Sequence, residues 1–317
     1  VTVGGAAKTI QHGATIIATG AKAAGTDEYL YGKHPRITRW HELEQNPDNL
    51  KEAKSVVFIQ CVGSRDDQRP YCSRICCTSS IMQAIGIKEA HPDIDVFILY
   101  RDIRTYGQRE ALYKKARELG VIFIRYTLEN KPTVTEAGET LEVGVFDPIL
   151  QRDLKIAADW VNLATAIEPM KNGALAELYK LPLNAENFFM EAHAKLRPVE
   201  FASDGIYLCG LAHYPKSIDE SIAQAMAAAS RAATVLSRES IQISPLVSQV
   251  DVEKCIGCGR CFKSCARKVL GPEDLVDEET DSTRMIMTIA NADNCVGCAG
   301  CGVACPKNCF SFTTLEA

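Results

Sequence analysis

The run SVVFIQC at residues 55–61 decides the fold, because it is apolar, β-branched and of strand length. Two runs of the same character follow it, DVFILY at 95–100 and VIFIRY at 121–126. The segments between them, 78–92 and 105–120, have the composition and apolar spacing of helices. Strands that alternate with helices at this spacing predict an α/β fold with a parallel, doubly wound sheet.

Weaker signals flank this sheet on both sides. IQHGATIIATG at 10–20 predicts a short buried strand that ends in a turn, and residues 131–157 predict an antiparallel meander. DWVNLATAIEP at 159–169 repeats the pattern of the first of these strands. Residues 204–236 predict a strand, a turn at Gly210 and a long Ala-rich helix. These segments predict a second lobe around the central sheet.

The bulk composition limits the possible classes of protein. With 317 residues, 46% of them hydrophobic, the chain can bury the cores of two or three domains. The net charge is −5 and no basic segment is concentrated enough for a nucleic-acid surface. We expect no membrane span, because no apolar run approaches roughly 18 residues, and no secretory signal opens the chain. The first residue is Val1, so we expect an upstream part to be missing.

Fourteen cysteines are the most informative count. A density this high fits either an oxidised secreted scaffold or a reduced metal protein. Eight of the cysteines fall in two short runs near the C-terminus, and four more fall between Cys61 and Cys77. Clustering at ligand spacing without a signal peptide favours metal binding in a reducing, cytoplasmic compartment.

The two C-terminal runs are CIGCGRCFKSC, here the first run (255–265), and CVGCAGCGVAC, here the second run (295–305). Both have the Cys-x2-Cys-x2-Cys-x3-Cys spacing in which three thiolates bind one 4Fe–4S cluster and the fourth serves the other cluster. The predicted ligands of one cluster are Cys255, Cys258, Cys261 and Cys305. Those of the other are Cys295, Cys298, Cys301 and Cys265.

Two structural zinc sites are the alternative for these eight cysteines. Zinc usually takes paired Cys-x2-Cys knuckles rather than four cysteines within eleven residues, so the spacing favours iron–sulfur clusters. Cys309 is left over and is expected to be a small buried apolar residue. The segment resembles bacterial-type two-cluster ferredoxins, and its long insert between the runs is most similar to the nitrogenase-associated ferredoxins.

Three segments resemble the flavin-contacting elements of glutathione-reductase-like flavoproteins: IIATGA at 16–21, LATAIEP at 163–169 and the segment that starts GIYLCG at 205. The resemblance implies a bound FAD, whereas an ordinary amphipathic helix near Ser217 is the alternative interpretation. No G-x-G-x-x-G follows a strand, so we expect FAD to be shared with an upstream segment or another chain. The expected contacts are Thr19, Gly20, Ala164, Thr165, Gly210, His213, Lys216 and Ser217.

The segment from residue 61 to residue 77, here the cysteine loop, contains Cys61, Cys72, Cys76 and Cys77. Its residues alone leave three sites open: an iron–sulfur cluster, a structural zinc or a redox-active cysteine pair. Together with VFILYRDIRTYG and ARELGVIFIRY, however, the loop resembles HdrA, the iron–sulfur flavoprotein of heterodisulfide reductase, over nearly all of residues 10–236. That resemblance implies a thioredoxin-reductase-like FAD domain with a further 4Fe–4S cluster on these four cysteines.

The resemblance also implies a function: an electron-transfer subunit that moves electrons between FAD and three 4Fe–4S clusters and passes them to partner subunits. Bifurcating members carry a lysine five residues beyond the double cysteine, where this chain has Met82, which argues against bifurcation but not against electron transfer. One alternative is a non-catalytic docking module fused to a ferredoxin. The other is a pyridine-nucleotide disulfide oxidoreductase that uses Cys76 with Cys77 or Cys72.

The sequence predicts four successive parts. Residues 1–50 end the FAD-binding lobe, and residues 51–158 form a second nucleotide-binding-like domain with the cysteine loop. Residues 159–238 return to the FAD-binding lobe, and residues 247–317 form the two-cluster ferredoxin domain.

Overall fold

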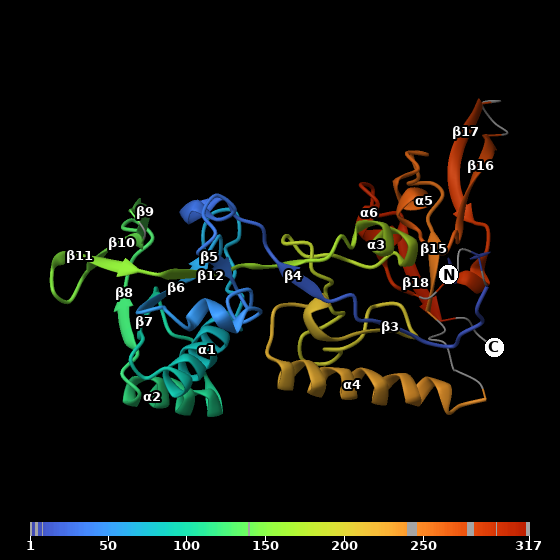
Figure 1. Cartoon of the computed structure of the whole chain (residues 1–317). Coiled ribbons are helices and arrows are strands. Elements are labelled where there is room, and N and C mark those ends of the chain that lie inside the picture. The colour runs from blue at the N-terminus through green and yellow to red at the C-terminus, as the bar shows by residue number, and fades with distance from the viewer. Residues whose placement is uncertain are drawn as a thin grey trace.

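The computed structural model of the chain describes residues 2–3, 6–7, 9–138, 140–239, 246–277, 282–295 and 297–314. Figure 1 shows a sheet domain at one end, a lobe with one long helix in the middle and a cysteine-rich unit at the other end. Within the described residues, no helix is both long and apolar enough to cross a membrane.

The sheet domain is built on five parallel strands in the order β5-β12-β6-β7-β8. The predicted strands are present as β6 (Ser55–Val62), β7 (Asp95–Tyr100) and β8 (Ile122–Arg125). The other two strands are β5 (Ile37–Arg39) and β12 (Trp160–Thr165). Every residue of β6 is buried, as expected for a parallel strand covered on both faces.

Alternate residues of β6 pack on opposite faces of the sheet. Val56 and Phe58 pack with the helices α1 (Cys76–Ala90) and α2 (Glu110–Glu118). Val57 and Ile59 pack with the meander on the other face. This alternation, with a period of two residues, explains why an apolar run without polar interruptions forms this strand.

Both helices differ slightly from the predicted ranges. The first was expected at 78–92, but α1 begins at Cys76, so both adjacent cysteines belong to its first turn. The second was expected at 105–120, but a 3-10 turn, η3 (Gly107–Arg109), precedes α2. Gly107 has a φ of 64°, which is outside the helical region and delays the start of the regular helix.

The antiparallel meander predicted at 131–157 is present and covers one face of the parallel sheet. It consists of β9 (Thr133–Ala137), β10 (Thr140–Asp147) and β11 (Arg152–Ala158), with β10 in the middle. Its core side chains alternate along β10 and join the same hydrophobic cluster as β6; they are Leu141, Val143 and Val145.

The sheet domain extends beyond the predicted boundaries at 50/51 and 158/159. Strand β5 lies within the segment assigned to the FAD-binding lobe, yet it pairs with β12 in the five-stranded sheet. Strand β12, assigned to the return to that lobe, pairs with β6 in the same sheet. Spatial neighbours in a parallel sheet need not be neighbours in sequence, so the apolar runs alone did not show which sheet these strands join.

The lobe contains the parallel pair β3 (Thr15–Ile17) and β14 (Ile206–Leu208). Two antiparallel strands, β4 (Ala21–Ala23) and β13 (Ile167–Pro169), connect it to the sheet domain, and β4 lies between the two parts in Figure 1. Its helices are α3 (Gly173–Tyr179), η4 (Gly210–Ala212) and α4 (Ile218–Leu236). The 3-10 turns η1 (Glu28–Leu30) and η2 (Pro47–Leu50) lie between β4 and β6 in sequence.

The cysteine-rich unit has two antiparallel strand pairs and two short helices. Strand β15 (Leu246–Val250) pairs with β18 (Phe310–Thr314), and β16 (Leu270–Asp277) pairs with β17 (Ser282–Ile289). Helices α5 (Arg260–Ser264) and α6 (Gly300–Ala304) each carry cysteines, and η5 (Ala292–Asn294) precedes the second run. A further short pair joins β1 (Thr2–Val3) to β2 (Ala6–Ala7). Residues 240–245 and 315–317, at the predicted boundary and the C-terminal end of this domain, lie outside the described residues.

Candidate iron–sulfur and flavin sites

Two cavities in the cysteine-rich unit are each lined by four cysteines of the two runs, and Cys309 also lines the first. The first cavity is lined by Cys255, Cys258, Cys261 and, from the other run, Cys305. The second cavity is lined by Cys295, Cys298, Cys301 and, from the other run, Cys265. This grouping is the one that the spacing of the two runs predicts. No three His, Cys, Asp or Glu side chains among the described residues stand close enough to hold a single metal ion.

Glycines allow both cysteine runs to pack tightly against neighbouring strands. Gly257 has a φ of 65°, and a Cβ atom there would lie 2.3 Å from the carbonyl oxygen of Met285. Gly297 has a φ of 64°, and a Cβ atom there would lie 2.8 Å from the carbonyl oxygen of Leu246. A side chain at either position would therefore push the cysteine run away from its strand.

Four backbone N–H groups, two at each cavity, donate matching hydrogen bonds to cysteine sulfurs. The four bonds form two equivalent pairs at the two cavities, each with an N···S distance of 3.4 Å. They run from Met287 to Cys255, from Ser248 to Cys295, from Val269 to Cys265 and from Cys309 to Cys305. Bonds of this kind stabilise negative charge on a metal-bound thiolate and help to set its reduction potential.

These hydrogen bonds favour the thiolate form of two of the cysteines. Burial acts to raise the pKa of Cys295, but hydrogen bonds from Gly297 and Ser248 lower that pKa overall. At Cys305 burial acts in the same direction, and the N–H of Cys309 contributes to a net lowering of the pKa. Both cysteines are thus prepared to bind a cation as thiolates.

Cys309 lies against the first cavity but behaves as a core residue. It is buried, and its position corresponds to that of Val269 at the second cavity, because both backbone N–H groups bond to the cysteine four residues earlier. Burial and a hydrogen bond with Cys305 raise the pKa of the Cys309 thiol to about 12. It therefore stays protonated, in keeping with the apolar role expected from the sequence.

The cysteine loop brings its four thiols together at one end of the parallel sheet. Cys61 is the second-last residue of β6 and has a φ of 60°, whereas Cys76 and Cys77 are the first two residues of α1. These three cysteines are buried, whereas Cys72 is partly exposed and accepts a hydrogen bond from the Arg74 N–H at 3.3 Å. Burial, with smaller contributions from the nearby Cys77 and Cys72, raises the pKa of Cys61 to about 11.

Two arginines, Arg65 and Arg104, lie beside this group of thiols. Arg65 pairs with Asp102 at 2.6 Å through one guanidinium nitrogen. A hydrogen bond from Cys76, with help from the Arg104 backbone N–H, lowers the pKa of Cys77 to about 7. The polar residues after β7, Asp102 among them, thus form an ion-pair network beside the cysteine loop.

Four of the predicted flavin contacts meet at the start of α4. The Lys216 ammonium donates to the Gly210 carbonyl oxygen at 2.8 Å and lies 3.3 Å from His213 Nδ1. Ser217 is the N-cap of α4, and its N–H donates to the Glu220 carboxylate at 2.9 Å, which completes a capping box. The helix begins where the sequence predicted, and Gly210, His213 and Lys216 are joined by hydrogen bonds beside its first turn.

Lys216 is an unusual member of this group because it is a buried cation. Only 8% of its surface is exposed, and burial, assisted by the charge of Arg74, lowers the pKa of Lys216 to about 8. Its neighbour His213 pairs with Glu191 at 2.8 Å, so the Glu191 carboxylate compensates part of this charge.

The other four predicted contacts lie elsewhere. Thr19 and Gly20 lie in the turn between β3 and β4, and the Thr19 hydroxyl donates to Asn172 at 3.0 Å. Ala164 and Thr165 are buried at the end of β12, in the sheet domain rather than in the lobe. The Thr165 hydroxyl accepts a hydrogen bond from the Trp40 indole at 2.8 Å, so the fold itself uses this side chain.

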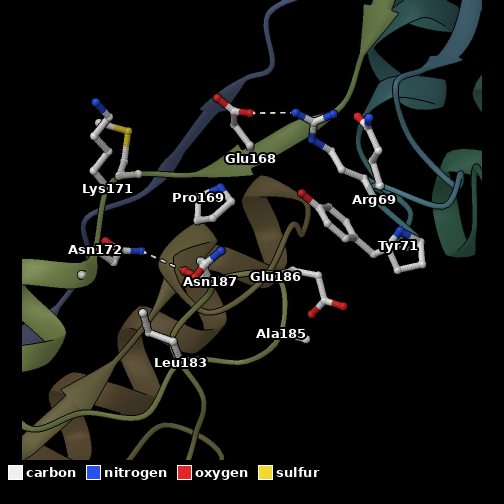
Figure 2. A pocket seen from close by; sticks show the side chains of 14 residues that line it. Arg69, Tyr71, Glu168, Pro169, Lys171, Asn172, Leu183, Ala185, Glu186 and Asn187 are labelled. Atoms are coloured by element: carbon white, nitrogen blue, oxygen red, sulfur yellow. Dashed lines mark hydrogen bonds and ion pairs between the residues drawn. The ribbon is translucent and has the colours of Figure 1, made fainter.

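A cleft of about 700 Å³ lies beside the cysteine loop, a volume typical of small-molecule and cofactor sites. Figure 2 shows its walls: Arg69 and Tyr71 from the cysteine loop, residues 168–173 after β12, and residues 183–187. Asn172 lines the cleft and also accepts the hydrogen bond from Thr19. No pattern in the sequence indicated this cleft, because its walls come from three separate segments.

An aromatic cluster connects the cleft to Cys72. The ring centroids of Tyr71, Phe188 and Tyr214 lie 5.4–5.7 Å apart, and the Tyr71 hydroxyl donates to the Ile167 carbonyl oxygen at 2.8 Å. Tyr71 lines the cleft, whereas Tyr214 lines a second hollow together with Cys72. The cluster thus provides flat apolar surfaces between the cleft and the four thiols.

Residues 254–309 match the family described as the 4Fe-4S dicluster domain. Among solved structures, the thioredoxin reductase of T. acidophilum superposes with a TM-score of 0.51 at 14% sequence identity. That match covers 71% of this chain and 66% of the reductase, and it establishes the fold alone. The prediction of a thioredoxin-reductase-like α/β domain with an added iron–sulfur domain is therefore confirmed.

Curated relatives give the closer sequence match. The HdrA-like heterodisulfide reductase protein of Archaeoglobus profundus is 38% identical over 239 residues, which are 73% of this chain and 34% of that protein. The HdrA component of the H(2):CoB-CoM heterodisulfide,ferredoxin reductase of Methanothermobacter marburgensis is 36% identical over 279 residues, 81% of this chain and 42% of that protein. This chain spans less than half the length of either relative. The chain is thus a relative of the heterodisulfide reductase component HdrA that carries a 4Fe–4S dicluster domain at residues 254–309.

Proposed function

We propose that this chain moves electrons between FAD and three 4Fe–4S clusters, as part of a heterodisulfide-reductase-like complex with partner subunits. The observation that carries the proposal is the pair of cavities, each lined by three cysteines of one run and one cysteine of the other. Every cluster needs four thiolates, and this interleaved arrangement supplies two complete sets.

The eight cysteines of the two runs fit their proposed clusters chemically. Cys255, Cys265, Cys295 and Cys305 each receive a backbone N–H, and such donors compensate the negative charge of a thiolate-bound cluster. When bound, a 4Fe–4S cluster accepts and releases one electron at a potential that its surroundings set. The chain's own contribution is to hold the sulfurs and to provide these hydrogen bonds.

The third proposed cluster lies in the cysteine loop, on Cys61, Cys72, Cys76 and Cys77. The Arg65 guanidinium supports this site, because its charge and its hydrogen bond to Cys61 favour the thiolate and oppose the rise in the Cys61 pKa that burial causes. The buried hydroxyl of Thr105, in the segment after β7, has no hydrogen-bond partner among the described residues. The positive end of α1 favours anionic sulfur at its first two residues.

We place the flavin ring beside the aromatic cluster and the cleft, within reach of the cysteine loop. In this arrangement Lys216 and the N-terminal turn of α4 supply positive potential, and Asn172 connects Thr19 to the cleft. FAD, when bound, exchanges electrons in pairs or singly and so connects two-electron and one-electron chemistry.

The glycine-rich unit for the ADP half of FAD would come from an upstream segment or another polypeptide. The exposed face of α4 supports this split, since Ile218, Ile222 and Met226 are 55–78% exposed and lie one turn apart. Apolar side chains repeated along one exposed helix face are typical of a surface that another element covers. We therefore propose that the glycine-rich unit packs on this face.

Metal analysis of the chain, purified without oxygen, tests the proposal directly. We expect about twelve irons and no zinc per chain if three 4Fe–4S clusters are present. Replacing Cys76 and Cys77 with serine should leave about eight irons, because only the cluster of the cysteine loop is lost. Eight irons with one zinc in the unmodified chain would overturn the assignment of the cysteine loop.

Double variants test the interleaved assignment of the two runs. Cys265→Ser combined with Cys295→Ser should leave about eight irons, because both changes affect the same cluster. Cys265→Ser combined with Cys255→Ser should leave about four, because the two changes affect different clusters. Cys309→Ala is the matched control and should retain all of the iron. If the first double variant retained about four irons and the second about eight, the interleaved assignment would be contradicted.

A further inference from the structure

The two cavities are related by an approximate internal symmetry that matches β15 with β17. The carbonyl oxygen of Leu246 approaches Gly297 as that of Met285 approaches Gly257. Two residues further along each strand, Ser248 donates its N–H to Cys295 as Met287 donates its N–H to Cys255. Ser248 and Met287 are thus equivalent positions at the two cavities.

The side chains at these equivalent positions differ in whether they can donate a hydrogen bond to a cysteine sulfur. The Ser248 hydroxyl lies 3.7 Å from Cys295 Sγ, and with a thiolate partner the hydroxyl is the donor. Burial raises the pKa of Cys301, and a hydrogen bond from the same hydroxyl opposes that rise. Met287 is 3% exposed and presents a thioether, which cannot donate a hydrogen bond.

The Cys309 thiol is a side-chain donor at the first cavity, and it reduces the difference that the Ser248 hydroxyl makes between the two cavities. The Cys309 thiol contacts Cys305, whereas Val269 occupies the equivalent position at the second cavity. A thiol is a weaker donor than a hydroxyl, so Cys309 offsets only part of the effect of Ser248.

Solvent exposure adds to the difference between the cavities. At the first cavity Cys255 and Cys261 are buried, at 7% and 5% exposed, whereas all four cysteines of the second cavity are at least partly exposed. Lys180 and Arg267 line the second cavity, against Lys307 at the first. Reduction makes a thiolate-bound cluster more negative, so burial disfavours reduction, and water and positive charge favour it.

We propose that Ser248 gives the cluster of the second cavity the higher reduction potential of the two, through a hydroxyl hydrogen bond that no described residue supplies at the first cavity. This inference rests on the proposed function. The second cavity is also lined by Lys180, Ala202 and Ser203 of the lobe, so the higher-potential cluster is the one beside the flavin-binding part. Electrons that enter at the first cluster therefore run downhill toward the lobe.

The test is a redox titration of the cluster-loaded full chain, followed by electron paramagnetic resonance. Ser248→Ala should lower the midpoint of the ferredoxin-domain cluster that is reduced first and leave the other midpoint in place. We expect the ratio of reduced to oxidised cluster at a fixed potential to fall about tenfold, which equals about 59 mV for one electron. Met287→Ser should raise the midpoint of the cluster reduced second, and it provides an independent measurement.

Three controls separate the hydrogen bond from a change in structure. Ser248→Thr keeps the hydroxyl and should restore the midpoint, whereas Met287→Leu adds no donor and should leave its midpoint unchanged. Ser311→Ala removes an exposed serine on the paired strand β18 and should also change nothing. All variants should keep the iron content of the unmodified chain.

Two results would overturn the inference. One is a Ser248→Ala midpoint that equals the unmodified value, and the other is a shift confined to the cluster reduced second. A chain without any cluster signal would instead refute the proposed function, so the two failures can be told apart.

Discussion

Single residues at the two cavities show which positions tolerate no side chain. Gly257 and Gly259 have nearly the same φ, 65° and 66°, but only Gly257 lies against a strand. Ala299, the equivalent of Gly259 in the second run, adopts a φ of 57°, so a methyl group is accommodated there. The two glycines therefore separate the cost of the conformation from the cost of the close contact.

Gly257→Ala should destabilise the cysteine-rich unit considerably more than Gly259→Ala. Both changes incur about 1–2 kcal/mol for a left-handed conformation, but only Gly257→Ala adds a clash with the Met285 carbonyl. Denaturant unfolding and iron retention of the two variants would measure the difference. Equal losses of stability would show that the close contact at Gly257 adds nothing to the cost of the substitution.

The buried Lys216 should make stability depend on pH in the alkaline range. Burial lowers its pKa in the folded chain to about 8 from the ordinary value of 10.5, so the unfolded chain binds the proton more tightly. The free energy of unfolding should therefore rise as the pH increases from 8 to 10.5, because the cost of burying the charge is relieved. Lys216→Met should remove this rise, and a slope unchanged in the variant would exclude Lys216 as its source.

The regular spacing of the two cysteine runs could be recognised in the sequence because the cysteines of each run lie within eleven residues. The ion pair of Arg65 with Asp102 and the contact of Thr19 with Asn172 join residues far apart in the chain, so only the fold brings them together. Ser248 was likewise not predicted, since it lies outside both runs and reaches Cys295 only through the packing of β15.

At the scale of single elements, the apolar pattern predicted whether a segment forms a strand or a helix better than it predicted the residue at which that element begins. The eight-residue strand β6 is predicted well because burial on both faces requires a continuous apolar run. Helix α1 begins two residues before the predicted start, because Ile75 rather than Thr78 or Ser79 is its N-cap. The predicted start of α4 near Ser217 is correct, and in the structure Ser217 and Glu220 form a capping box there.

Glu220→Ala should destabilise the start of α4 by about 1 kcal/mol or more, as expected for the loss of a cap. Glu220 also pairs with Arg74 at 2.6 Å and accepts the Tyr106 hydroxyl at 2.8 Å, so these partners are lost as well. Thermal unfolding would measure the change. Glu118→Ala, at an exposed ion pair on α2, is the control and should cost only a few tenths of a kcal/mol. A similar effect of both changes would argue against the cap.

At the scale of the whole molecule, the sequence predicted the class of fold and the added iron–sulfur domain but not the extent of the sheet domain. The alternation of strands and helices identifies a parallel sheet wherever it occurs in a chain. It does not reveal that β12 pairs with β5 on one side and with β6 on the other. Three-residue strands such as β5 carry too little pattern to be assigned to one sheet.

The extent of the sheet domain predicts which fragment folds. Residues 34–166 contain all five parallel strands and should unfold cooperatively as an isolated domain. Residues 51–158 lack β5 and β12, which leaves the edge of β6 and one side of its apolar core exposed. Denaturant unfolding and chromatography of the two fragments would compare them. Cooperative folding of the shorter fragment would instead favour the boundaries predicted from the sequence.

The exchange of one cysteine between the two runs has a consequence for how the C-terminal unit can be divided. Since Cys265 lines the cavity of the second run and Cys305 that of the first, deleting either run leaves both cavities incomplete. If the proposed clusters are bound there, a chain that lost one run would hold neither cluster of this unit on four cysteines. Residues 255–305 therefore form one functional unit that cannot be divided between its two runs.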